Sequence, residues 1–337
     1  MKAFLKSILN FTLFLFGRHR FPAITPQLVV LGYHRVLPAD HDDMEFMQPG
    51  MVVTPETLEL HLSVLKKYFE FMHLEDWLDM VRNNEPIPNR CCALTFDDGW
   101  SDNFDYALPI LQKHQTPATV FLVSDMVGTN QSFWPERMFR LLQNLTKEQL
   151  NDLLKQDQNS WLNEICRINK NTELNKETID NAIMLVKQLT DHEIINKLDV
   201  IELTLSIDSN HRDILNWHEV DQMQQNDLVR FGSHTRSHKR LDKLKLAEIE
   251  DEVVSSLKEI NSKVDHQVQL FCYPNGNTTE KAEHLVQSNF IGACTTVPGW
   301  NKPSTSHYHL KRFLLHEDMC NSEIKLMACL SRTIKKF

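Results

Sequence analysis

The chain has 337 residues, of which 42% are hydrophobic, so it can build one large core or two smaller ones. Its 36 basic residues stand against 45 acidic ones, which gives a formal net charge of −9, and it has no long basic run. The chain offers few clustered basic groups to a phosphate backbone, so the composition argues against nucleic acid as a partner. The seven cysteines are odd in number and form no Cys-x-x-Cys pair, which favours a reducing, cytoplasmic compartment.

Residues 1–27 form a segment of their own before the first predicted strand. Its mainly apolar stretch, residues 4–16, is flanked or interrupted by Lys2, Lys6, Arg18 and Arg20. The stretch is shorter than the roughly 20 residues that cross a bilayer, and the basic residues after it make a poor signal-peptidase site. Three interpretations remain open: a helix docked on the domain, an interfacial helix that gives residues 1–20 peripheral membrane contact, or an export signal.

Predicted strands and helices alternate in the first part of the chain. The apolar run at residues 28–34 predicts a buried strand, and Thr54-Pro55 predicts a helix start with Thr54 as its N-cap. The pattern then predicts a helix from Leu74, a strand over 91–96, a helix over 103–114 and a strand over 118–123. This order is typical of parallel β/α units.

A change of character follows between residues about 134 and 225, where apolar residues recur at helical spacing among Asn, Gln, Lys and Glu. Strands are predicted again over 228–232, 268–272, 290–294 and 309–315, with a helix over 246–264. We therefore expect an α/β fold, a distorted (β/α)7-type barrel domain over residues 28–337 with a mainly helical insertion.

Polar clusters directly follow three of the predicted strands. They are Asp97-Asp98, His234-Thr235-Arg236-Ser237-His238 and Tyr273-Pro274-Asn275-Gly276. Functional side chains of β/α barrels gather at such strand ends. A carboxylate and two imidazoles can bind a metal with open positions, and a second carboxylate can serve as base. Alone, the aspartates could also be a helix N-cap and the histidines a surface pair.

Taken together, the motifs resemble those of the polysaccharide deacetylase family (NodB-like, carbohydrate esterase family 4). The sequences Thr95-Phe96-Asp97-Asp98-Gly99 and His234-Thr235-Arg236-Ser237-His238 resemble its first two signatures. Phe271 to Gly276 resembles the third in a Tyr-Pro-x-Gly variant, and Leu31 to Val36 resembles an opening found in one branch. The resemblance covers residues 28–318 apart from the insertion.

The resemblance implies a role for each matching residue. Asp97 would be the general base, and Asp98, His234 and His238 would bind a divalent metal, zinc first, with cobalt, nickel and iron as alternatives. Tyr273 and Pro274 would line the substrate site, with the Tyr273 N–H directed at the oxyanion.

Two positions depart from the family's pattern, and a third is open. The arginine that orients the base in the better-known third motif is missing, and Arg312 is the candidate substitute; a structural arginine is the alternative. His316 fits the family's general acid loosely, within a segment that also fits a branch without that histidine. His34 either faces the site or is a core histidine.

The expected activity is metal-dependent hydrolysis of N-acetyl groups on an amino sugar, a polysaccharide or a glycan precursor, such as a cell envelope polysaccharide. An amidohydrolase, an O-deacetylase or a non-catalytic carbohydrate-binding relative are the alternatives. The expected partner is an N-acetylated sugar or glycan; the oligomeric state is left open.

Overall fold

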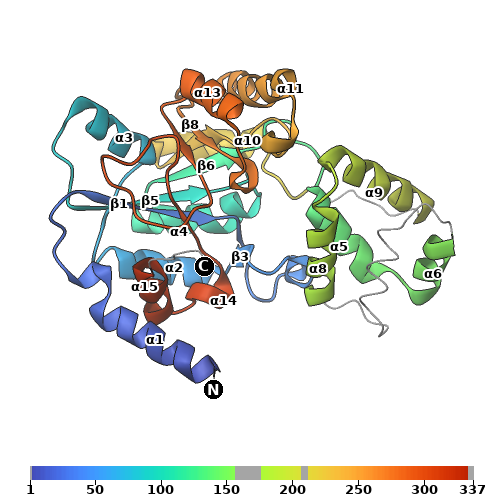
Figure 1. Ribbon diagram of the computed structural model, residues 1–337, viewed down its shortest axis with the longest axis horizontal. Coiled ribbons are helices and arrows are strands. Elements are labelled where there is room, and N and C mark those ends of the chain that lie inside the picture. Colours follow the sequence, from blue (N-terminus) through green and yellow to red (C-terminus); the bar gives the residue numbers. More distant parts are fainter. Residues whose placement is uncertain (1, 156–175, 206–211, 333–337) are drawn as a thin grey trace. The chain divides into compact units, whose positions relative to one another are not determined.

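The computed structural model describes residues 2–155, 176–205 and 212–332 (Figure 1). The chain divides into two compact units. The barrel unit comprises residues 1–38, 52–129 and 213–337, and the helical unit comprises residues 39–51 and 130–212. The parts of the predicted insertion at 156–175 and 206–211 lie outside the described residues.

The barrel unit is built on a parallel sheet in the order β10-β1-β5-β6-β7-β8-β9, and β4 also pairs with β5. The strands are β1 (Gln27–Tyr33), β4 (Glu70–Phe71), β5 (Arg90–Phe96), β6 (Ala118–Leu122), β7 (Val229–Ser233), β8 (Leu270–Cys272), β9 (Gly292–Cys294) and β10 (Phe313–Leu314). A separate pair joins β2 (Arg35–Val36) to β3 (Val52–Val53). The expected α/β barrel-like fold is confirmed as a curled, parallel half-barrel.

The last strand region brings the two edges of the sheet together. Leu310 bridges Cys294 in parallel, while β10 pairs with Leu31 and Gly32 of β1. The backbone N–H of Leu315 then donates to Gly32 O at 2.8 Å. A single short segment therefore spans from β9 to β1.

Register explains why distant residues meet at one edge. Tyr33 of β1 lies opposite Phe96 of β5, and Leu122 of β6 lies opposite Ser233 of β7. Because the strands are parallel, the residues that follow them leave the sheet at the same edge. His34, Asp97 and His234 are these residues.

Helices surround the sheet of the barrel unit: α1 (Lys2–Phe16), α2 (Pro55–Leu65), α3 (Leu74–Asn83), α4 (Leu108–His114), α10 (Trp217–Gln224), α11 (Leu246–Glu250), α12 (Ser256–Asn261), α13 (Glu280–Asn289), α14 (Glu317–Cys320) and α15 (Glu323–Ser331). Helix α2 begins as the sequence predicts, with the Thr54 hydroxyl accepting the Thr57 N–H at 3.2 Å. Helix α1 packs against α15 (Figure 1). No helix among the described residues is long and apolar enough to cross a membrane.

The helical unit has a core of its own. Its described helices are α5 (Trp134–Asn144), α6 (Lys147–Lys155), α8 (Lys176–Val186) and α9 (Asp191–Leu205). Apolar side chains of all four, among them Phe139, Leu153, Ile183 and Leu198, form one buried cluster. Residues 39–51 belong to this unit, whereas α10, which falls inside the predicted insertion, belongs to the barrel unit.

Candidate active site

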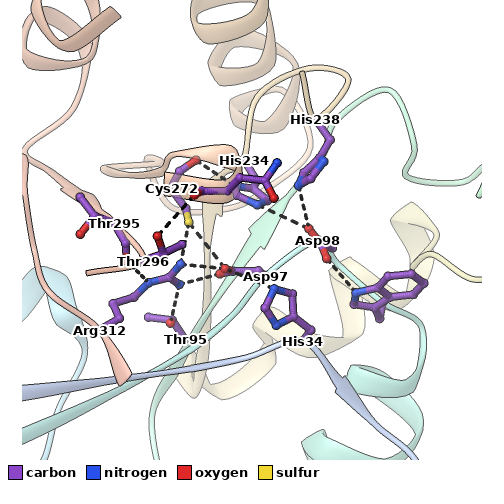
Figure 2. A network of polar contacts seen from close by, with 12 residues as sticks. His34, Thr95, Asp97, Asp98, His234, His238, Cys272, Thr295, Thr296 and Arg312 are labelled. Carbon is purple, nitrogen blue, oxygen red and sulfur yellow. Dashed lines mark hydrogen bonds and ion pairs between the residues drawn. The ribbon is translucent and has the colours of Figure 1, made fainter. Parts of the chain in front are cut away.

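Asp97 and Asp98 follow β5, whose residues Cys91 to Phe96 are all buried, and both carboxylates are themselves buried. Asp98 adopts a positive φ of 76°, which few residues other than glycine accept. This turn sends the two adjacent side chains in different directions, as Figure 2 shows. Asp97 points toward Arg312, and Asp98 points toward the two histidines.

Asp98, His234 and His238 converge on one point. The Nε2 atoms of His234 and His238 each lie 3.4 Å from Asp98 Oδ1, and the ligand atoms of the three residues are within 4.8 Å of one another. Asp98 Oδ1 is buried and has no hydrogen-bond partner. A buried carboxylate oxygen without a hydrogen-bond partner and two imidazole nitrogens that face it are a set of ligands that suits a divalent cation.

Neighbouring groups fix the orientation of these three side chains (Figure 2). His234 Nδ1 lies 2.8 Å from the carbonyl oxygen of Cys272, so Nδ1 carries the hydrogen and Nε2 offers its lone pair. Trp100 Nε1 donates to Asp98 Oδ2 at 3.0 Å, and the backbone N–H of His238 donates to Thr235 Oγ1 at 2.9 Å. Burial alone would raise the pKa of Asp98, but its interactions with the neighbouring imidazoles of His234 and His238 hold that pKa well below its usual range.

Asp97 is clamped by Arg312, which is wholly buried. The guanidinium donates to Asp97 Oδ1 at 2.7 Å and to Oδ2 at 2.8 Å, a bidentate pair. Thr95 Oγ1 and the carbonyl oxygen of Thr295 accept further hydrogen bonds from Arg312 at 3.0 Å each. Burial alone would raise the pKa of Asp97, but the Arg312 charge lowers it below its ordinary value. Asp97 is therefore ionised at neutral pH.

Cys272 belongs to a second cluster of ligand types, together with Asp97 and His234. Its Sγ lies 3.1 Å from Arg312 Nη2 and 3.7 Å from Asp97 Oδ2. The positively charged guanidinium of Arg312 already lies beside Cys272 Sγ and the Asp97 carboxylate, and it would repel a cation there. This second cluster is therefore a poor cation site. Of the two clusters, the one formed by Asp98, His234 and His238 is the better metal site.

His34, which follows β1, turns its ring toward the site (Figure 2). Its Nε2 lies 3.9 Å from Asp97 Oδ2, and 19% of its side chain is exposed. The Asn103 side chain donates to the His34 carbonyl oxygen at 2.9 Å and fixes the backbone there. Of the two interpretations of His34, the structure supports the one that places it at the site.

The structure corrects the expectation for Tyr273. Its backbone N–H donates to the carbonyl oxygen of Cys294 at 3.2 Å, because Tyr273 continues the pairing of β8 with β9. This N–H is therefore committed to the barrel and is not available to an oxyanion. Tyr273 and Pro274 are both buried, and the Tyr273 ring packs against Phe271.

His316 is not brought to the site either. Strand β10 ends at Leu314, and His316 becomes the N-cap residue of α14. There it lines a groove of about 780 Å³ together with residues of α1, α14 and α15. The predicted strand ran to residue 315, which would leave His316 at its end, whereas the observed strand stops at Leu314 and the chain turns into α14.

Glu252 is a residue that sequence reasoning missed. It is buried and accepts hydrogen bonds from the backbone N–H groups of Arg236 and Ser237, at 3.1 and 2.8 Å, and from the Ser237 hydroxyl. It thereby anchors the loop between the two histidines, in which Thr235 and His238 have positive φ values of 69° and 60°. No motif marks it, since it lies in a helical region of ordinary composition.

Comparisons with known proteins agree with this geometry. A family model described as polysaccharide deacetylase matches residues 84–290. The chain is 26% identical over 133 residues to the poly-beta-1,6-N-acetyl-D-glucosamine N-deacetylase of Staphylococcus epidermidis, covering 37% of this chain and 43% of that protein. It is 31% identical over 64 residues to the Bacillus subtilis protein YxkH, covering 19% of this chain and 23% of that protein. The matched regions thus span less than half the length of these relatives.

Solved structures resemble the whole fold. The Streptococcus pyogenes deacetylase PplD in complex with acetate has a TM-score of 0.60 at 15% identity, covering 91% of this chain and 100% of that one. IcaB from Ammonifex degensii has a TM-score of 0.59 at 16% identity, covering 90% of this chain and 97% of that one. At such low identity the likeness is one of fold.

Proposed function

The chain belongs to the polysaccharide deacetylase family, and from that premise we propose that it is a metal-dependent hydrolase that removes N-acetyl groups from an amino sugar within a glycan. The observation that carries the proposal is the convergence of Asp98, His234 and His238 beside the Asp97–Arg312 pair. Three ligands at strand ends leave open positions for water and substrate.

Asp98, His234 and His238 would hold the cation, with zinc as the first candidate and cobalt, nickel and iron as alternatives. When bound, such a cation supplies Lewis acidity and lowers the pKa of a water molecule. The hydrogen bond from His234 to the Cys272 carbonyl and that from Trp100 to Asp98 hold two of the ligands in place for it.

Asp97 is the general base of the proposed reaction. It takes a proton from the water that attacks the acetyl carbonyl carbon. Arg312 holds both carboxylate oxygens and keeps the group ionised, so Arg312 is a positioning residue rather than a proton carrier. The carbon–nitrogen bond then breaks, and acetate and a free amine leave.

The departing amine needs a proton, and His34 is the group we assign to deliver it. Its ring nitrogen is 3.9 Å from Asp97 Oδ2 and is partly open to solvent, whereas His316 lies in the groove beside α1. A histidine at this place can pass on the proton that Asp97 accepts.

A relative indicates which substrate class to test first. The Staphylococcus epidermidis protein is named a poly-beta-1,6-N-acetyl-D-glucosamine N-deacetylase, so a β-1,6-linked N-acetylglucosamine oligomer is the first substrate to test here.

The test measures acetate release from N-acetylglucosamine oligomers by the full chain loaded with zinc, together with its bound metal. Asp97→Asn is expected to lower kcat about 10³-fold with metal retained, whereas Asp98→Asn and His234→Ala are expected to lose both metal and turnover. His218→Ala, an exposed histidine of α10, is the matched control. Full turnover by the Asp98 and His234 variants would refute the assignment.

Substrate profiling separates the alternatives. Release of acetate from O-acetylated sugars alone would indicate an O-deacetylase, and binding of oligomers without any acetate release would indicate a carbohydrate-binding relative.

A further inference from the structure

Helix α1 turns its apolar side outward. Its exposed large apolar side chains are between 43% and 69% accessible: Phe4, Leu5, Ile8, Leu9, Phe11, Leu15 and Phe16. Successive positions of an α-helix are about 100° apart, so these seven side chains share one side that covers roughly 160° of the helix. This side runs along the whole length of α1.

The opposite, narrower side attaches α1 to the barrel unit, beside α15 (Figure 1). Asn10 Oδ1 accepts a hydrogen bond from Arg332 at 2.7 Å, and the backbone at Gly17 approaches the Ser331 side chain closely. An amphipathic helix of a globular domain normally buries its apolar face. Helix α1 leaves its apolar side exposed. Phe4, Ile8 and Phe11 border the groove beside α14 and α15 but are still about half exposed or more, so the domain's own core accounts for only part of this apolar side.

The apolar strip continues beyond the helix. Phe21 is 57% exposed and Ile24 is 96% exposed, both in the connection between α1 and β1. Exposed apolar surface of such extent is typical of an interaction site.

Charge indicates the kind of partner. The first 39 residues contain no aspartate or glutamate, although the whole chain has a net charge of −9. Lys6 and Arg20 of this segment are exposed. A symmetric contact with a second copy of the chain would place these basic groups near one another, whereas an anionic lipid surface would satisfy both the apolar and the basic groups.

We propose that the outward side of α1 lies in the interface of an anionic bilayer, with the helix along the membrane plane. The seven exposed apolar side chains of α1 enter the boundary between headgroups and acyl chains, and the positive charges of Lys6 and Arg20 attract the helix to the anionic surface. The barrel unit is thereby held at a membrane surface. This proposal does not depend on the catalytic assignment.

The experiment is cosedimentation of the full chain with vesicles of phosphatidylcholine alone or with about 30% phosphatidylglycerol, in about 0.1 M and about 1 M salt. The strip variant replaces Leu5, Leu9 and Phe16 by serine. The matched control replaces Met184, Val200 and Leu203, which are apolar residues of the helical unit at least 58% exposed, by serine. Thermal unfolding and light scattering of each protein report its fold and its oligomeric state.

We expect binding to the anionic vesicles that weakens at high salt. The strip variant should lose at least 100-fold in vesicle affinity, because each large apolar side chain contributes about tenfold, while the control variant binds like the wild type. Replacement of Lys6 and Arg20 by glutamine should weaken binding about tenfold at low salt.

Three results would overturn the proposal. In the first, the wild-type chain stays in the supernatant with anionic vesicles. In the second, a folded strip variant binds as well as the wild type. In the third, the wild type is a dimer and the strip variant is a monomer. The last would assign α1 to contacts between copies of the chain.

Discussion

Arg312 controls the charge state of Asp97, since both are buried and the guanidinium contacts both carboxylate oxygens. The sequence suggested this pairing only as a substitute for a missing motif arginine. The pair is separated by 215 positions along the chain, so only the register of β5 and β10 against β1 could show that the two side chains meet.

Arg312→Lys should raise the pH at which activity begins. A lysine offers one point charge in place of two parallel hydrogen bonds, so burial would push the pKa of Asp97 upward and the base would protonate at higher pH. We expect the acidic limb of the kcat/KM profile to move up by about one pH unit, from the energetics of a lost charge-assisted bond. An unmoved limb with reduced kcat would instead indicate a purely structural arginine, and bound zinc should stay unchanged.

Glu252 should control metal affinity without touching the metal. Glu252→Ala removes the acceptor for the Arg236 and Ser237 N–H groups, so the loop that carries His234 and His238 loses its anchor. Zinc affinity, measured by competition with a chelator, should fall about 10- to 100-fold, and Glu252→Gln should recover part of the loss. Glu250→Gln, on the exposed side of α11, is the control; equal affinities for all variants would remove Glu252 from the site.

At the scale of elements, the strands of three or more residues were predictable, including β8 and β9, whereas the two-residue strands were not. β1, β5, β6 and β7 lie within a residue or two of their predicted bounds, because strands buried on both faces are continuously apolar. β10 pairs over only two residues, and the apolar pattern around it could not reveal where pairing stops. His316 was misassigned for that reason.

The first turn of α3 contains an acid whose ionisation opposes folding. Glu75 is buried, and burial raises its pKa to about 7. The native state therefore binds this proton more tightly than the unfolded state does. Stability falls as pH rises from the unfolded pKa near 4.5 through 7, and the loss is complete above that range.

Glu75→Gln should abolish this loss. The free energy of unfolding of the variant, relative to that of the wild type, is expected to rise by about 2 kcal/mol from pH 5 to pH 8, given the size of the pKa shift. Denaturant unfolding at both pH values measures it, with the exposed Glu85→Gln as control. If the difference in unfolding free energy between the variant and the wild type is the same at both pH values, the proton uptake does not belong to Glu75.

At the scale of the whole molecule, the two-unit organisation was only partly predictable. The helical stretch after residue 134 showed its periodicity in the sequence, but residues 39–51 have no such pattern and join the helical unit through tertiary contacts, such as that of Lys176 with the Met44 carbonyl oxygen. Contacts of this kind depend on folding and leave no local signal.

The barrel unit should fold without metal. Its strands carry a large apolar core, from Leu28 to Leu310, that does not involve the ligand side chains. Chelation should therefore leave the far-ultraviolet circular dichroism unchanged, and saturating zinc should raise Tm by a few degrees through binding to the native state alone. Loss of helical signal on chelation would show instead that the cation is needed for folding.

The segment that joins β9 to β1 also carries Arg312. During synthesis, a nascent polypeptide that has reached residue 309 already contains both aspartates and both histidines, yet it lacks the guanidinium that binds both carboxylate oxygens of Asp97. Arg312 must leave the ribosome before it can bind the Asp97 carboxylate. The same short segment completes the sheet, so sheet completion and the positioning of the general base occur together, late in folding.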